Sequence, residues 1–404
     1  DQADAIIANT AKVGITSTQA SAIETNTAKV GLTSTQATLL DGITATATEI
    51  NYIDGVTSSI QDQINANANQ VNISGGNLSV GTATMNTNEG ADNTVFGSGS
   101  MYTNTSGSYN TAIGRYSLTL NTTGNNNNGF GNNSLYNNTT GSSNVAMGNY
   151  ALFNNTTANS NVAIGAQSLK DNTIGTYNSG LGAASLTANT TGNYGTALGA
   201  FTLKANTTGS GNTAMGTNAM ESNTTGEGNT VSGWNALVSN STGGYNVSMG
   251  VNAMFKNVTG SNNVAIGKSA LYNSTVSGNV ALGNEALYAN TTGEYNVGVG
   301  NGALKSNTTG ETNTAVGFSS LSSNTTGDEN SSLGHGSLEA NTTGFKNSSM
   351  GSYSLWKNTT GQYNSAFGHA SLQENTEGIV NTAVGVWAMR QNTTGSRNTA
   401  FGYE

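Results

Sequence analysis

One short phrase recurs at a fixed period through most of this chain, and that period restricts the possible folds more than any other feature. Aligning the copies places a glycine at the same point in each, from Gly97 to Gly402. Successive glycines lie 17 residues apart, except for Gly267 and Gly283, which lie 16 apart. A fixed period of this size predicts a stack of similar coils, which is an all-β repeat protein of the parallel β-roll or β-solenoid class.

Each copy has the same internal order. A lead of the type Asn-Val-Ala-Ile, as in residues 161–164, precedes the glycine and is typical of a short β-strand. Leu or Met follows the glycine by four residues, as Leu118 does, which predicts one large core residue per coil. "NTTG", as in residues 121–124, then supplies a turn. The shortened copy loses its residue between Leu271 and Asn279, so we expect the turn to absorb the deletion.

Two asparagine columns run through the copies. The first leads the strand, as Asn110 does, and is interrupted at Gly195. The second opens the turn, as Asn121 does, and we expect it to move to Asn273 in the shortened copy. Stacked coils place equivalent amides about 4.8 Å apart, where each can bond to the next. The columns therefore predict asparagine ladders that satisfy polar groups inside a narrow coil.

The composition agrees with a stacked fold and excludes other classes. Only 34% of the residues are hydrophobic and 8% are charged, with 54 Gly, no Pro and no Cys, so neither a large globular core nor disulfides are expected. A net charge of −9 argues against a general affinity for nucleic acid. There is no apolar run of about 18 residues, so we expect no membrane insertion.

The two faces of the strand phrase indicate a partner. Val162 and Ile164 share one face, whereas Ala163 takes the other, and both faces are small or apolar in many copies. One face can line the interior of the coil, and the other is then left to be covered. We therefore expect a homotrimer packed around a shared axis, with a solenoid about 90 Å long.

The chain before the array has a different pattern. Residues 1–72 predict a fibrous shaft with short helical segments, because apolar residues from Ile50 to Val71 follow coiled-coil spacing. Isoleucine at both core positions favours trimers, and Asn67 is suited to fixing the register. An amphipathic helix on another surface is the alternative. Residues 73–92 predict a strand-rich adaptor, and residues 93–404 predict about 18–19 coils.

Two segments resemble known families. Residues 45–64, "ATATEINYIDGVTSSIQDQI", resemble shaft segments of bacteriophage tail fibre proteins. The "NTAIGxxSLxxNTTG" array resembles repeats of phage fibres that carry a C-terminal self-cleaving chaperone domain. The "NVAIG" strand is similar to the head repeats of trimeric autotransporter adhesins, although the 17-residue coil is longer than theirs. The resemblance implies a trimeric left-handed β-roll and says little about function.

No catalytic, cofactor-binding or metal-binding residues are expected. His335 and His369 lie two coils apart in one column, which is too far for a shared metal along one chain. The residue after the core Leu or Met is more informative, because it varies within a rigid repeat. Its aromatic members are candidate surface contacts, with packing between neighbouring subunits as the alternative; we select Tyr136, Phe153, Phe255, Tyr272, Tyr288 and Trp356. Aromatic residues also occur before the strand Asn, as at Tyr177 and Tyr245.

Three functions fit these features, and none is enzymatic. The first is a structural fibre protein of a phage virion tail, bound to other tail proteins and to a host-surface glycan or protein. The second is a bacterial cell-surface adhesin or extracellular filament. The third is a solenoid that binds ice through a threonine row, although the "NTT" threonines fall in expected turns.

Overall fold

The computed structural model describes residues 71–85 and 89–404, together with Thr18 and Ala22. The chain forms two compact units, Asp1–Asn69 and Gln70–Glu404, and the second unit holds nearly all of the described residues. The predicted shaft therefore lies outside the described residues, apart from Thr18, Ala22 and its last two positions. Val71, the last residue of the coiled-coil spacing, lies in the first strand.

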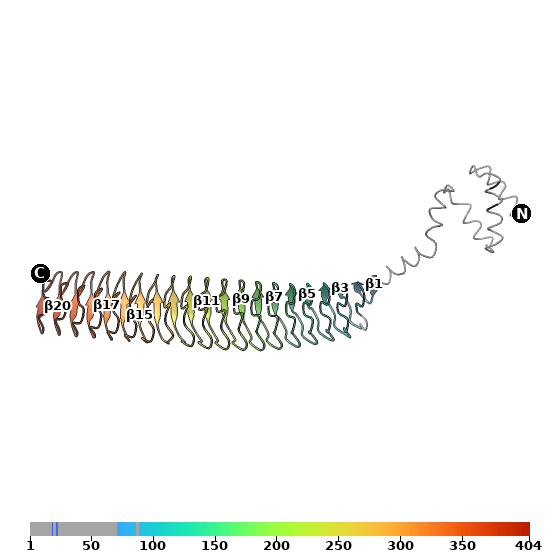
Figure 1. Ribbon diagram of the computed structural model, residues 1–404, viewed down its shortest axis with the longest axis horizontal. Helices are drawn as coiled ribbons and strands as arrows, with labels where there is room; N and C mark the ends of the chain where they lie inside the picture. Colours follow the sequence, from blue (N-terminus) through green and yellow to red (C-terminus); the bar gives the residue numbers. More distant parts are fainter. Residues whose placement is uncertain (1–17, 19–21, 23–70, 86–88) are drawn as a thin grey trace. The chain divides into compact units, whose positions relative to one another are not determined.

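The second unit is a parallel β-solenoid, which confirms the fold class and the 17-residue coil (Figure 1). Each coil contributes one three-residue strand, and the rest of the coil is turn and extended backbone. The strands are β1 (Val71–Ser74), β2 (Asn77–Val80), β3 (Thr94–Phe96), β4 (Thr111–Ile113), β5 (Asn128–Phe130), β6 (Val145–Met147), β7 (Val162–Ile164), β8 (Ser179–Leu181), β9 (Thr196–Leu198), β10 (Thr213–Met215), β11 (Thr230–Ser232), β12 (Val247–Met249), β13 (Val264–Ile266), β14 (Val280–Leu282), β15 (Val297–Val299), β16 (Thr314–Val316), β17 (Ser331–Leu333), β18 (Ser348–Met350), β19 (Ser365–Phe367), β20 (Thr382–Val384) and β21 (Thr399–Phe401).

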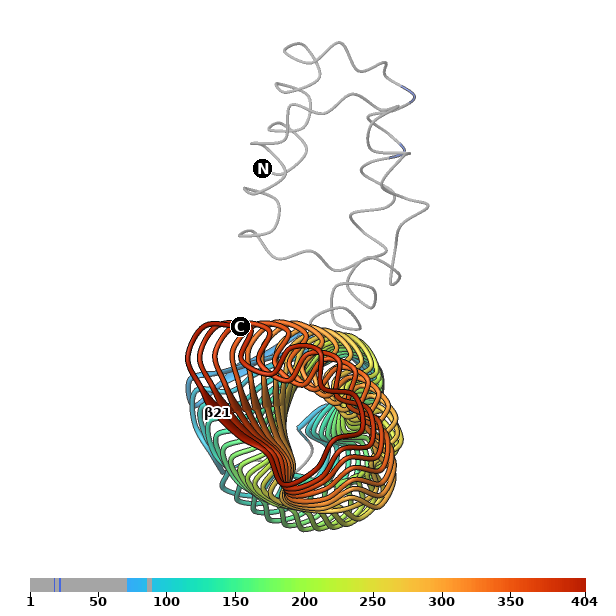
Figure 2. The ribbon, with the colours of Figure 1, turned by 90° about the vertical axis from the view of Figure 1, so that its left-hand side faces the viewer.

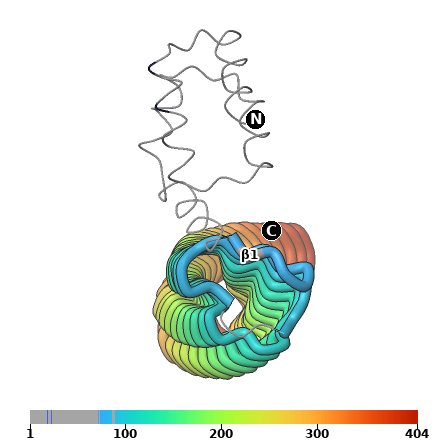
Figure 3. Tube along the Cα trace, turned by 90° about the vertical axis from the view of Figure 1, so that its right-hand side faces the viewer, coloured from blue at the N-terminus to red at the C-terminus, as the bar shows by residue number. Residues whose placement is uncertain are grey.

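The strands form one sheet along the axis of the stack. From β2 to β21 every strand pairs in parallel with the next, and equivalent residues face each other, as Ala163 faces Ala146 and Gly180. Viewed along the axis, the coils superimpose with a gradual rotation (Figure 2). At the N-terminal end, β1 pairs antiparallel with β2 (Figure 3). The predicted adaptor thus contributes a hairpin whose second strand begins the parallel sheet.

The core is a narrow column in which the same positions of each coil are buried. The middle residue of each strand from β3 to β20 points inward and is buried, as Ala163 is. The predicted core residue after the glycine, Leu118 in one coil, is fully buried in the same cluster. The face alternation expected within the strand is therefore confirmed, because Ile164 lies on the exposed side.

The core leucines have an unusual backbone conformation. Leu118 has a φ of 52°, and Tyr116 two residues earlier has a φ of 58°. Such a left-handed conformation costs about 1–2 kcal/mol for an ordinary residue. Complete burial of a leucine side chain returns about 1.5–3 kcal/mol, and the Leu118 N–H donates to the carbonyl of Ser134 in the next coil. Burial and the inter-coil hydrogen bond together offset the backbone strain.

Both asparagine columns form the ladders that the sequence predicts. In the turn, Asn121 Nδ2 donates to Asn104 Oδ1 in the preceding coil at 2.7 Å and to Gly124 O in its own coil at 3.0 Å. At the strand lead, Asn127 N donates to Asn110 Oδ1 at 2.9 Å. The side chains are buried. The ladders therefore join successive coils through the interior, where an unpaired amide would be costly.

The shortened coil keeps its strand pairing and changes its turn. Val264 still faces Val280, which confirms that the turn absorbs the deletion. The expected displacement of the turn ladder to Asn273 is wrong: Ser274 is the buried residue in that place, and Asn273 Nδ2 bonds to the Tyr288 carbonyl. Asn290 Nδ2 reaches Ser274 Oγ only at 3.5 Å, because the serine side chain is too short to continue the ladder.

The backbone hydrogen bonds of the turn are also interrupted beside this coil. In a regular coil the N–H groups of Thr190 and Thr191 donate to Thr207 O at 2.9 and 3.2 Å. The N–H groups at the equivalent positions, Val258 and Thr259, have no such partner within the part of the chain that the structure describes. This junction therefore keeps its strand pairing and lacks two of the backbone hydrogen bonds that join the turns of regular coils.

We expect the amides of Val258 and Thr259 to exchange with solvent at least about tenfold faster than those of Thr190 and Thr191, because only the latter are hydrogen-bonded. Hydrogen–deuterium exchange with mass spectrometry measures the two segments in one sample. The equivalent amides of a third coil, at Thr207 and Thr208, serve as the control. Equal protection in all three segments would show that the junction is closed in solution.

Candidate functional site

The six candidate contact residues lie in one column of the turn. Each directly follows the buried Leu or Met of its coil, and each is half-buried. The rigid backbone of the turn fixes their direction, because the preceding residue is anchored in the core. The column therefore lies along the surface of the stack, with one side chain per coil.

Five of the six candidates contact one another within this chain. Tyr136 and Phe153 stack with ring centroids 5.3 Å apart. Phe255 stacks on Tyr272 at 5.0 Å, and Tyr272 stacks on Tyr288 at 5.1 Å. Within each ladder the facing surfaces of the rings cover each other. Packing within one chain thus accounts for these five aromatic residues without a partner.

Trp356, the sixth candidate, is arranged differently. Its ring meets Tyr353 edge-on at 5.9 Å and an interplanar angle of 77°. Its Nε1 donates to Glu339 Oε2, one coil earlier, at 2.8 Å. The ammonium group of Lys357 lies 5.6 Å from the ring centroid. Trp356 thus has a carboxylate bonded to its ring nitrogen, whereas a lysine beside the ring also occurs in a stacked ladder, where Lys256 lies 5.8 Å from the Tyr272 centroid.

The second variable column, before the strand Asn, is more exposed than the first. Tyr194 is 65% exposed and stacks on Tyr177 at 5.4 Å. Tyr245 Oη donates to Glu227 Oε1 at 2.7 Å. That hydrogen bond, together with the negative charge of the carboxylate, raises the pKa of Tyr245 above its ordinary value. These tyrosines lie on a separate part of the coil from the six candidates.

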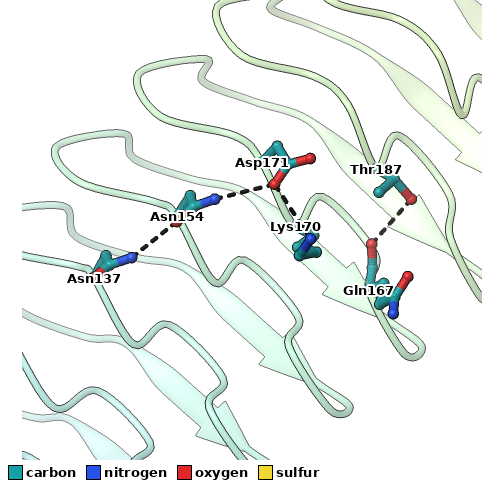
Figure 4. A network of polar contacts seen from close by, with 6 residues as sticks. All are labelled: Asn137, Asn154, Gln167, Lys170, Asp171 and Thr187. Carbon is teal, nitrogen blue, oxygen red and sulfur yellow. Dashed lines mark hydrogen bonds and ion pairs between the residues drawn. The ribbon is translucent and has the colours of Figure 1, made fainter.

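Polar side chains in the next position of the turn, directly before the ladder asparagine, also bond between coils. Asn137 Nδ2 donates to Asn154 Oδ1, and Asn154 Nδ2 donates to Asp171 Oδ1, at 2.9 and 3.1 Å (Figure 4). Lys170 lies 3.8 Å from the same carboxylate. Such exposed pairs add little stability. They show that amide and carboxylate side chains at this position of the turn bond to the next coil.

The two histidines lie on either side of one tyrosine. His335 and His369 both lie against Tyr353, with ring centroids 4.9 and 6.3 Å from it. No group of three or more metal-ligating side chains occurs among the described residues. Tyr353 therefore separates the imidazoles, as expected for side chains two coils apart.

The outward side of the strands carries a further surface, which runs along the parallel sheet. The third residue of each strand from β3 to β21 points outward and is large and apolar, with Ser232 as the one polar member among these strands. Ile164 and Met147, for example, are 37% and 43% exposed. We call this set the outer apolar row. The alternation within "NVAIG" predicts that the third strand residue faces outward. The repeat places this residue in every coil, so the row is continuous.

The described residues include no helix that is long and apolar enough to cross a membrane.

A search of protein-family models and a search of curated proteins both returned no match to this chain.

Proposed function

We propose that this chain is a structural fibre protein of a phage virion tail, in which three copies form a shaft that carries a host-recognition surface. The observation that carries the proposal is the outer apolar row, which follows the sheet from β3 to β21. A continuous apolar row of this length is typical of a surface that another protein covers. Its regular spacing suits a partner with the same spacing, which a second and a third copy of the chain provide.

The mechanism is mechanical reach combined with avidity. A stack of coils joined by backbone hydrogen bonds and asparagine ladders is stiff along its axis, so it can hold a surface away from the particle. Three parallel copies present each surface residue three times, which raises the effective concentration of weak contacts. The expected partners are other virion tail proteins and a host-surface receptor.

A cell-surface adhesin or extracellular filament of a bacterium is the second candidate, because it would use the same solenoid and the same apolar row. Ice binding is less well supported. The first threonine of the "NTT" phrase uses its hydroxyl within the stack, as Thr190 Oγ1 donates to Thr207 O at 3.1 Å. That row therefore has few free hydroxyl donors.

Immunogold electron microscopy with an antibody against residues 93–404 tests the proposal and separates the first two candidates. We expect gold label on thin filaments at the tails of virions. Label confined to the surface of bacterial cells would overturn the virion assignment in favour of the adhesin. Label on neither structure would contradict both candidates.

A further inference from the structure

Five rings gather on the turn side of the coils that contain β16 to β19. They are Phe318, His335, Tyr353, Trp356 and His369, and we call them the ring patch. Phe318 and His335 have centroids 5.3 Å apart at 71°, and His335 and Tyr353 have centroids 4.9 Å apart at 52°. Tyr353 meets Trp356 at 77° and His369 at 78°. Every contact within the patch is thus tilted or edge-on.

These angles distinguish the patch from the stacked ladders. Phe255 and Tyr272 lie at an interplanar angle of 3°, so each ring covers a face of the other. Rings that meet at steep angles cannot cover each other's faces in this way, because an edge contacts only part of one face. Phe318 is 55% exposed and His335 is also exposed. The rings of the patch therefore leave parts of one another's faces uncovered, whereas the stacked faces of Phe255 and Tyr272 cover each other.

Hydrogen-bonding groups lie among these rings. Glu339 Oε2 holds the Trp356 indole N–H at 2.8 Å, which fixes the orientation of the largest ring. Lys357 Nζ lies 2.6 Å from Glu374 Oε2 and over the Trp356 ring. The second oxygen of each carboxylate has no hydrogen bond among the described residues, so it can accept one from a ligand. Apolar ring faces beside polar groups match a ligand that has both apolar C–H faces and hydroxyl groups.

The charges of the patch narrow the ligand class. The patch contains two carboxylates, Glu339 and Glu374, and one ammonium group, Lys357. The local charge is thus slightly negative at neutral pH, and the whole chain carries a net charge of −9. Such a surface repels sulfated, phosphorylated or carboxylated ligands.

We propose that the ring patch binds a neutral glycan, with sugar rings on the faces of Trp356, Tyr353 and His335 and with sugar hydroxyls bonded to Glu339 and Glu374. The five rings span coils spaced by about 4.8 Å along the axis. An extended glycan that lies along the axis therefore contacts several of them at once. This inference rests on the proposed function, in which the host-surface receptor is a glycan or a protein.

Affinity gel electrophoresis of the full chain tests the inference. The gels contain a neutral glucan, a neutral mannan or a neutral galactan, and dextran sulfate is the anionic comparison. The test variant combines Trp356→Ala with Tyr353→Ala. Both positions tolerate small residues in other coils, since Thr187 and Ala370 occupy them there, so the fold is expected to persist. We expect at least one neutral gel to retard the chain and the variant to bind at least about tenfold more weakly.

A matched control removes aromatic rings from a stacked ladder, through Phe255→Ala with Tyr272→Ala, and is expected to leave retardation unchanged. Trp356→Phe keeps a ring face and is expected to retain most of the binding. Absence of retardation in all three neutral gels would overturn the inference, as would stronger retardation by dextran sulfate or an equal loss in the ladder control. Because none of these outcomes alters the molar mass of the assembly, failure of the glycan site is distinguishable from failure of the fibre.

Discussion

Gly131→Ala is expected to lower the free energy of unfolding by about 3–5 kcal/mol. Gly131 directly follows β5 and has a φ of +134°, a conformation that residues with a Cβ rarely adopt. A Cβ at this point would also lie 2.7 Å from the carbonyl oxygen of Gly148 in the next coil. The carbonyl belongs to the stacked backbone, so the coils would have to move apart. Urea unfolding followed by circular dichroism measures the loss.

Gly211→Asn is the matched control for this substitution. Gly211 also has a positive φ, +67°, but the nearest atom to an added Cβ is the Gly228 nitrogen at 3.9 Å. Asparagine is found in the same column at Asn126 and Asn262 with similar φ values. We expect a change of less than about 1 kcal/mol. Equal destabilisation by the two variants would show that close stacking of the coils is not the cause.

Asn189→Leu is expected to cost about 3 kcal/mol, although leucine is similar in size. Asn189 Nδ2 donates to Asn172 Oδ1 at 2.7 Å and to Gly192 O at 3.0 Å, and its Oδ1 accepts from Asn206 Nδ2 at 2.9 Å. The substitution removes all three bonds and leaves the Asn172 oxygen buried without a partner. The three hydrogen bonds of Asn189 are thus expected to stabilise the fold more than the buried apolar side chain of leucine does.

The same urea unfolding experiment measures this loss, with Asn132→Ala as the control. Asn132 is exposed, and its side chain takes part in no hydrogen bond among the described residues. A surface change of this kind is expected to stay within about 0.5 kcal/mol. A stability of Asn189→Leu equal to that of the unaltered chain would contradict the role of the ladder.

Several parts of the fold could be predicted because the repeat forces equivalent residues into equivalent places. The period set the coil length, and one invariant large residue, such as Leu118, identified the core. The alternation within "NVAIG" placed Ala163 inside and Ile164 outside. The asparagine columns predicted ladders because stacking leaves few other partners for buried amides. Each of these inferences depends on nearest-neighbour stacking alone.

Other features depend on information that the repeat does not carry. Nothing in leucine's propensity indicates a left-handed backbone, which only inter-coil hydrogen bonds and burial stabilise. The sequence of the shortened turn does not show which residue of the repeat is missing. It therefore could not decide whether Asn273 or Ser274 takes the buried ladder position. The angle between Tyr353 and Trp356 also depends on neighbours such as Glu339. The difference between stacked ladders and the ring patch was therefore not visible in the column pattern.

The molar mass of the purified chain in solution, measured by light scattering on a sizing column, tests the central claim most directly. We propose that two further copies of the chain cover the outer apolar row, so we expect about three times the chain mass of 40.9 kDa. Glutamate at Ile164, Leu181 and Leu198 is expected to reduce the mass to that of one chain, because charges in the row oppose its burial. A single-chain mass for the unaltered protein would contradict the fibre and leave the outer apolar row without its proposed partner.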